Sequence, residues 1–334
     1  MEMNVNDKRT KSGHFEVGDG DDGAIMEMKD MQGKMLVIKE RAIYEVSFAD
    51  TIDPKREYPD LPANVQKKLI DLGTESQLAS KTYLMALKMM KPEYISAYVD
   101  VKRALEVSFE LLLELHKLNQ EKESYRLAEK AAIEEYELRR GQKLDYKLPS
   151  IPDIQTRCKT FFQKADHVLQ TLMEINSLFF IEKKLHKQAH FDTFLSLLKE
   201  EYGEKDDFVK MIEQVLPFLK KLRALRDCLD HRQDGVIITD FDLQLNNNVL
   251  TPTISLNFRK ETIERMPLEM LMDATTKNLL YTVESTLALL CGKHVCIDKM
   301  MPYCLRFIPK QQRRNKYIKY AFWSPIGELG WFYQ

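Results

Sequence analysis

The sequence predicts a mainly α-helical bundle that carries a β-hairpin insertion and ends in a small irregular C-terminal segment. Long stretches repeat apolar residues at helical spacing, and short segments with proline or glycine separate them. Between about residues 235 and 259 the period changes to strict alternation, which is typical of paired strands. After residue 300 prolines recur and no period is clear. We therefore expect one bundle with one hairpin.

Four regions follow along the chain. Residues 1–23 are polar and acidic, so we expect a disordered tail that is dispensable for folding, because it offers too little apolar surface to offset chain entropy. Residues 24–62 hold short β-prone runs ended by prolines, which predicts an extended arm or strands. The helical bundle takes up 63–292, and a basic, aromatic C-terminal segment takes up 293–334.

The clearest helix runs from about residue 95 to about residue 140, because its apolar residues form one long stripe that includes Leu112. Its second half is charged and is expected to project into solvent. The same pattern predicts further helices over residues 64–90, 154–185, 191–202, 208–231 and 267–290. In the hairpin, residues 237–245 and 250–258 alternate around a turn of three asparagines, and Pro252 indicates an edge strand.

Composition excludes several classes of protein. Lys and Arg total 50 against 51 for Asp and Glu, so the whole molecule has no general field that attracts nucleic acid or acidic membranes. No run approaches the roughly 18 apolar residues of a membrane-spanning helix, and the five cysteines are scattered as in reduced proteins, so we expect a cytoplasmic protein without membrane contact. Phosphate-binding loops, dinucleotide fingerprints, nucleophile elbows, kinase motifs and metalloprotease motifs do not occur.

The most specific motif lies where the helix over 208–231 ends. Arg226 is followed directly by Asp227 and, five residues after the arginine, by His231. This pattern resembles the motif of the HEPN superfamily. The resemblance implies a helical bundle that acts as a homodimer and cleaves RNA without a metal. It would give Arg226 the role of stabilising phosphate charge, His231 that of proton transfer, and Asp227 that of orienting both.

Two other interpretations of this motif stay open. Arg9 and His14 have the same spacing within the acidic tail, so the spacing alone carries little information. A capped, solvent-facing helix end would explain the residues without any chemistry. The third alternative is RNA binding without cleavage.

The C-terminal segment is a second candidate, because its cations alternate with aromatic residues as in surfaces that contact phosphates and stack on bases. The candidate nucleic-acid-binding residues are Lys310, Arg313, Arg314, Lys316 and Lys319. Alternatively, the aromatic side chains anchor the segment to the core while the cations stay in solvent.

Four residues of zinc-binding type also gather near the last helix: Cys291, His294, Cys296 and Cys304. Their separations differ from those of paired zinc knuckles, so inert buried thiols are preferred and no metal or cofactor is expected. Two functions therefore remain. One is a HEPN-like RNA-binding protein or metal-independent ribonuclease, and the alternative is a non-enzymatic helical protein that binds another protein or acts as a scaffold.

Overall fold

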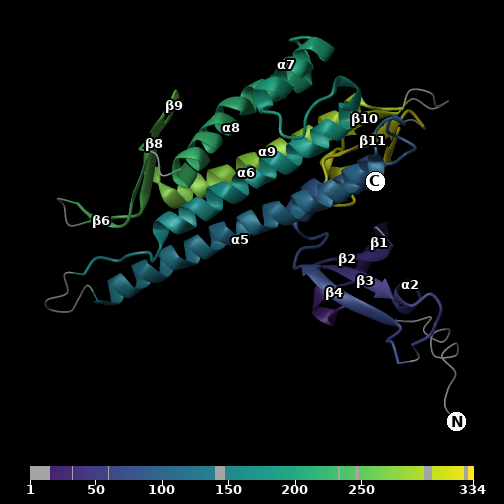
Figure 1. Ribbon diagram of the computed structural model, residues 1–334, viewed down its shortest axis with the longest axis horizontal. Coiled ribbons are helices and arrows are strands. Elements are labelled where there is room, and N and C mark those ends of the chain that lie inside the picture. Colours follow the sequence, from purple (N-terminus) through teal and green to yellow (C-terminus); the bar gives the residue numbers. More distant parts are fainter. Residues whose placement is uncertain are drawn as a thin grey trace. The chain divides into compact units, whose positions relative to one another are not determined.

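The computed structural model describes residues 16–31, 33–58, 60–139, 147–231, 234–244, 248–296, 303–326 and 330–334. It forms two compact units, both drawn in Figure 1. The sheet unit comprises residues 1–88 and 306–334, and the helical unit comprises residues 89–305. Of the described residues, 52% are helical and 21% lie in strands. The prediction of a mainly α bundle with one hairpin is wrong, because the described residues form four antiparallel sheets.

The sheet unit begins with a four-stranded antiparallel sheet in which sequential strands are neighbours. Its strands are β1 (Ile25–Met31), β2 (Lys34–Lys39), β3 (Ile43–Phe48) and β4 (Asn64–Ile70), and the short helix α2 (Ala49–Ile52) follows β3. Residues 24–62, predicted as an extended arm, therefore supply three of the four strands. Val37, Tyr44 and Val46 pack with Val17 and Ala42 in the hydrophobic core beneath this sheet.

The helix predicted over 64–90 is wrong in its first part, because β4 occupies residues 64–70. β4 pairs with β3 from Asn64 opposite Phe48 to Ile70 opposite Ile43, with one register shift, and this pairing makes the segment a strand. After β4, Gly73 packs so closely against the backbone of residues 39–40 that a side chain there would meet the Lys39 carbonyl oxygen. The helical part is short and consists of α3 (Gln77–Ala79), the π-helical turn η2 (Ser80–Leu84) and α4 (Met85–Met89).

Residues 16–23, which we expected to belong to the disordered tail, are folded onto the sheet and include the 3₁₀ turn η1 (Gly20–Asp22). Val17 is only 4% exposed within the hydrophobic core. The buried Lys39 ammonium donates to the backbone oxygens of Val17, at 2.7 Å, and Asp19, at 2.9 Å. Asp22 accepts a hydrogen bond from the Tyr44 hydroxyl. Residues 1–15 lie outside the described part of the chain.

Truncation through residue 23 is therefore expected to lower the melting temperature by several degrees. Burial of a valine side chain such as Val17 contributes about 1.5 to 3 kcal/mol, and the truncation also strips the Lys39 ammonium of two acceptors. Differential scanning calorimetry of the truncated chain and of Val17→Asp measures this loss. Glu16→Gln, at the exposed neighbouring position, is the matched control and should leave the melting temperature unchanged. An unchanged melting temperature after truncation would contradict the packing role of residues 16–23.

The C-terminal segment, predicted as irregular, forms a second sheet in the order β10-β11-β12. Its elements are β10 (Cys304–Phe307), the 3₁₀ turn η4 (Lys310–Gln312), β11 (Tyr320–Ser324) and β12 (Trp331–Tyr333). The aromatic residues of this segment favour strands, which explains why a sheet forms here. Asn315 joins the segment to the rest of the sheet unit, because its side-chain amide donates to the Thr74 carbonyl oxygen and the Ser80 hydroxyl.

The helical unit contains five long helices, among its described residues, and most of the predicted helices are confirmed there. They are α5 (Val101–Arg139), α6 (Ile154–Phe179), α7 (Phe191–Tyr202), α8 (Asp207–His231) and α9 (Leu268–Lys293), with the 3₁₀ turn η3 (Ile181–Lys183) after α6. α5 and α6 lie side by side along most of their length, and α8 packs on α6 and α7 (Figure 1). Leu112 is fully buried, which confirms the apolar stripe of α5. In the charged second half of α5, Tyr125 and Glu129 are also buried.

The predicted hairpin is present between α8 and α9 but is part of a larger structure. Its strands are β5 (Val236–Thr239), β6 (Asp242–Leu243), β7 (Val249–Leu250) and β8 (Thr253–Phe258), followed by β9 (Glu261–Pro267). β5 pairs with β8 and β6 with β7, as the alternation predicts. β9 adds a third strand, so β8 is central in the order β5-β8-β9. Pro252 precedes this central strand and does not mark an edge strand.

Candidate functional site

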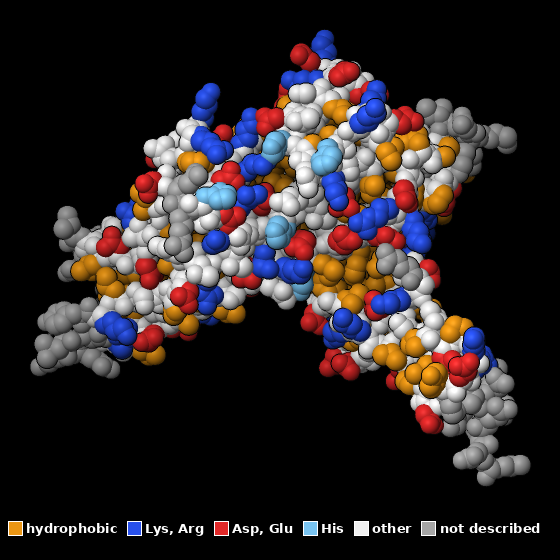
Figure 2. All heavy atoms as spheres, in the orientation of Figure 1, with side chains coloured by type: hydrophobic (Ala, Val, Ile, Leu, Met, Phe, Trp, Pro, Cys, Tyr) orange, Lys and Arg blue, Asp and Glu red, His pale blue; other side chains and the backbone are white. Residues whose placement is uncertain are grey.

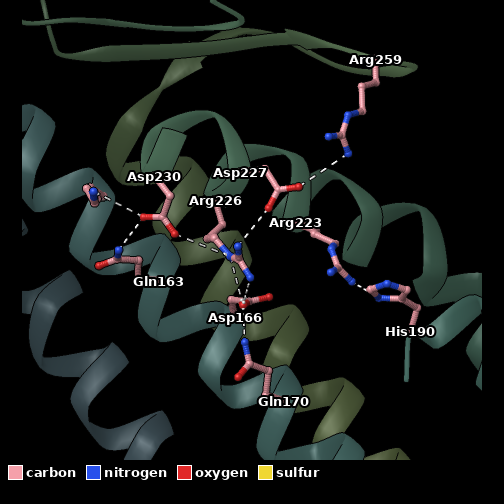
Figure 3. Close-up of polar contacts among 10 residues, drawn as sticks. Gln163, Asp166, Gln170, His190, Arg223, Arg226, Asp227, Asp230 and Arg259 are labelled. Carbon is pink, nitrogen blue, oxygen red and sulfur yellow. Dashed lines mark hydrogen bonds and ion pairs between the residues drawn. The ribbon is translucent and has the colours of Figure 1, made fainter. Parts of the chain in front are cut away.

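Arg226 lies on the side of α8 that faces α6, next to the apolar residues of α8 that pack into the core. Leu222, Leu225 and Cys228 are buried on either side of it in the sequence. The guanidinium donates to the Asp166 carboxylate of α6 twice, from Nε at 3.1 Å and from Nη2 at 2.8 Å. It also donates to the neighbouring Asp227, at 3.1 Å. The side chain is 22% exposed and bridges the two helices (Figure 3).

Three carboxylates surround this one guanidinium. Asp230, one turn after Arg226 on α8, has its Oδ2 3.8 Å from Arg226 Nε and accepts a hydrogen bond from Gln163. Burial by itself lowers the pKa of Arg226, but the hydrogen bond and charge of Asp166 and the charges of Asp227 and Asp230 outweigh burial and raise it. Arg226 is therefore held in its charged form by acids of the same chain.

The structure brings together two of the three predicted catalytic residues. Arg226 and Asp227 are in direct contact. His231 is the last residue of α8, exposed, and among the contacts of the described residues none joins it to Arg226 or Asp227. The separation agrees with helix geometry, because a spacing of five residues places two side chains about 140° apart around the axis.

A cavity of about 560 Å³ opens beside Arg226, between α6, the start of α7, α8 and the residue after β8. Its lining carries five cations, one histidine and three carboxylates, so positive charge is in excess. These residues are Lys187, Lys220, Arg223, Arg226 and Arg259, then His190, then Asp166, Asp192 and Asp227. Figure 2 shows histidine, lysine and arginine side chains gathered over the face formed by α6 and α8. The floor is apolar, with Leu169, Met173 and Leu219 among its residues.

His190 is the histidine that lies in this cavity, and our reading of the sequence assigned it no role. It immediately precedes α7, and its Nδ1 faces the Arg223 guanidinium (Figure 3). Arg259 reaches the cavity from the end of β8 and lies 3.6 Å from the Asp227 carboxylate. One sequence pattern could have indicated this face: Lys220, Arg223 and Arg226 recur at intervals of three along α8.

The basic C-terminal residues are divided between packing and exposure. Arg313 donates from Nε to the Ile308 carbonyl oxygen, and its guanidinium carbon lies 4.7 Å from the Phe307 ring centre. The Lys316 ammonium lies 4.8 Å from the Tyr317 ring centre. Lys310, Arg314 and Lys316 are exposed, and Lys319 is half-buried. Lys310, Arg313, Arg314, Lys316 and Lys319 thus do not form one uniform cationic surface.

Among the candidate zinc ligands near the end of α9, Cys291 and His294 are buried, whereas Cys296 and Cys304 are half-buried. Cys291 is fully buried, which raises the pKa of its thiol, and His294 lies among aromatic rings. Within the described part of the chain, no three His, Cys, Asp or Glu side chains are arranged to hold a metal ion.

No model of a known protein family matches the sequence, and no curated protein and no solved structure is significantly similar to it. None of the described helices is long and apolar enough to cross a membrane. Any function must therefore be argued from the side chains themselves.

Proposed function

We propose that the helical unit binds RNA through phosphate contacts in the cavity beside Arg226. The observation that carries the proposal is the excess of cations in a concave site with an apolar floor. Phosphate contacts by Lys and Arg supply most of the affinity of proteins for nucleic acid, and apolar surface accommodates unstacked bases. The HEPN resemblance of Arg226, Asp227 and His231 favours RNA among nucleic acids.

The cations differ in how free they are to bind a phosphate. Arg226 is engaged by carboxylates, so it is suited to shaping the site. Lys187 and Arg223 are exposed, and the Arg223 guanidinium contacts Nδ1 of His190. Arg259 is 68% exposed, and its guanidinium lies 3.6 Å from the Asp227 carboxylate and 4.7 Å from the Phe258 ring centre. We therefore expect the phosphates to bind to Lys187, Arg223 and Arg259.

Cleavage is the second form of the same proposal. It requires His231 to reach the phosphate that the cations hold, and the HEPN resemblance implies that a second copy of the chain supplies it. The engagement of Arg226 by three carboxylates favours binding over cleavage, because a neutralised guanidinium stabilises less charge in a transition state.

Single-stranded RNA should bind to the purified protein in the presence of a chelator, as measured by fluorescence anisotropy over a series of salt concentrations. Arg223→Gln and Arg259→Gln should each weaken binding and reduce the slope of log affinity against log salt by about one. Lys210→Gln is the matched control, because Lys210 is an exposed cation on the same helix outside the cavity. Unchanged affinity in both cavity variants would exclude the cavity as the binding site.

The same samples test cleavage. If the protein cuts RNA without metal, His231→Ala should slow the reaction by about 10² to 10⁴ while leaving binding intact. Cleavage that persists in His231→Ala would indicate a contaminant or another active site. Failure to bind any RNA would favour the protein-interaction alternative, for which α5 offers exposed apolar residues at Leu127 and Leu138.

A further inference from the structure

The sheet unit has a cavity of its own, about 820 Å³ in volume, that plays no part in the site beside Arg226. Segments from far apart in the sequence line it: β1, residues 74–88, residues 314–321 and Gln334. A volume of this size is within the range of pockets that bind small organic molecules. The cavity is therefore large enough for a ligand of nucleotide size.

Its lining combines positive charge with apolar and aromatic side chains. Arg314 and Lys316 are exposed cations at its edge. A third cation, Lys88, is neutralised by Glu27, whose carboxylate is 2.9 Å from the ammonium. Met26, Leu84, Ile318 and Ala321 form apolar wall, and Tyr317 and Tyr320 add two aromatic rings. Glu75 is the remaining carboxylate side chain of the lining, and it pairs with Arg41 at 3.5 Å. Arg314 donates to the Gln334 backbone oxygen at 3.4 Å, and no carboxylate side chain of the lining pairs with Arg314 or Lys316 among the ion pairs of the described residues, so this part of the rim attracts an anion.

Asn315 holds the two rim cations in place. Its side-chain amide donates to the Thr74 carbonyl oxygen at 2.9 Å and to the Ser80 hydroxyl at 3.0 Å, and its Oδ1 accepts the Tyr317 backbone N–H at 2.9 Å. Arg314 and Lys316 are the residues on either side of this anchor. Their backbone is therefore fixed before any ligand arrives, which lowers the entropic cost of binding.

We infer that this cavity binds a nucleotide, with the base against the tyrosine rings and the apolar wall and the phosphate on Arg314 and Lys316. Aromatic rings stack on bases of any sequence, and arginine pairs with two phosphate oxygens at once. The nucleotide is either a free nucleoside monophosphate or the phosphorylated end of an RNA strand. The inference is independent of the RNA site in the helical unit, since the two cavities share no residue.

Isothermal titration calorimetry of the full chain with AMP, GMP, CMP and UMP tests the inference, with adenosine and inorganic phosphate titrated separately. At least one nucleoside monophosphate should bind more tightly than adenosine and than phosphate. The double variant Arg314→Gln with Lys316→Gln should weaken it by about tenfold or more. Lys67→Gln, at an exposed cation of the sheet unit outside the cavity, is the matched control and should bind as the unmodified protein does.

A short RNA with and without a 5′-phosphate separates the two sources. Tighter binding of the 5′-phosphorylated RNA than of any mononucleotide, lost in the double variant, assigns the site to RNA ends, and the reverse order assigns it to free nucleotides. Arg223→Gln should leave nucleotide binding unchanged, so failure of the RNA site in the helical unit is distinguishable from failure of this one. The inference is overturned if no monophosphate and no phosphorylated RNA end binds, or if the double variant binds them as tightly.

Discussion

Replacing Arg226 with alanine is expected to lower the free energy of unfolding by about 3 kcal/mol. Loss of one partner of a buried ion pair typically costs about 3 to 5 kcal/mol, and the 22% exposure of Arg226 places it at the lower end. The cost arises because Asp166, Asp227 and Asp230 would remain close together without the guanidinium that neutralises them. Urea denaturation at neutral pH measures the change.

Arg223→Ala is the matched control, because Arg223 lies one turn earlier on α8, is exposed and contacts the His190 ring. It should cost less than about 1 kcal/mol. The double variant Arg226→Ala with Asp166→Ala should recover part of the loss, since it removes a carboxylate along with its partner. A loss below about 0.5 kcal/mol in Arg226→Ala would show that the ion pairs are not structural and would free Arg226 for a ligand.

The expected loss of stability affects how RNA-binding measurements on Arg226 variants are interpreted. A loss of RNA binding in Arg226→Ala would combine a binding effect with a folding effect. Arg223→Gln and Arg259→Gln avoid this problem, because neither side chain is enclosed by carboxylates of α6. The proposed function therefore depends on residues beside the motif as much as on the motif itself.

The helical unit was predictable where one face of a segment is buried along its whole length. α7 matches its predicted bounds, and α8 begins within one residue of them, because their apolar residues keep helical spacing. The pairing of β5 with β8 was predictable for the same reason with a period of two. β9 was missed because all of its side chains are exposed or half-buried, so it has no continuous apolar face.

The sheet unit was not predictable, because its stability depends on contacts between distant segments. β4 contains enough apolar residues to fit a helical pattern, and only pairing with β3 makes it a strand. Val17 is buried by strands that follow it in the sequence, which no local composition reveals. The candidate site could be predicted only in part for the same reason. Arg226 and Asp227 are adjacent in the sequence, whereas their partner Asp166 comes from α6, 60 residues earlier.

His294 is expected to make the stability of the helical unit depend on pH between about 6.5 and 4. Its ring is 5% exposed, with Nδ1 2.6 Å from the Tyr98 hydroxyl and Nε2 3.5 Å from the Tyr202 hydroxyl. Phe179 and Phe180 enclose it edge to face. A neutral imidazole has one donor and one acceptor for the two phenols. Burial lowers the pKa of His294 from 6.5 to about 4, and the charge of Glu201 opposes this only weakly.

Because the folded pKa of His294 lies below the unfolded one, the unfolded chain binds a proton first as the pH falls. The stabilisation is complete above pH 6.5, is reduced by about 2 kcal/mol at pH 5 and by up to about 3 kcal/mol near pH 4. Urea denaturation at pH 7 and pH 5 measures the difference. In His294→Asn, the difference in the free energy of unfolding between pH 7 and pH 5 should be smaller by about 2 kcal/mol. In His186→Asn, at an exposed histidine, this difference should be the same as in the unmodified protein. An equal fall in stability for the unmodified protein and His294→Asn would assign the acid sensitivity to other groups.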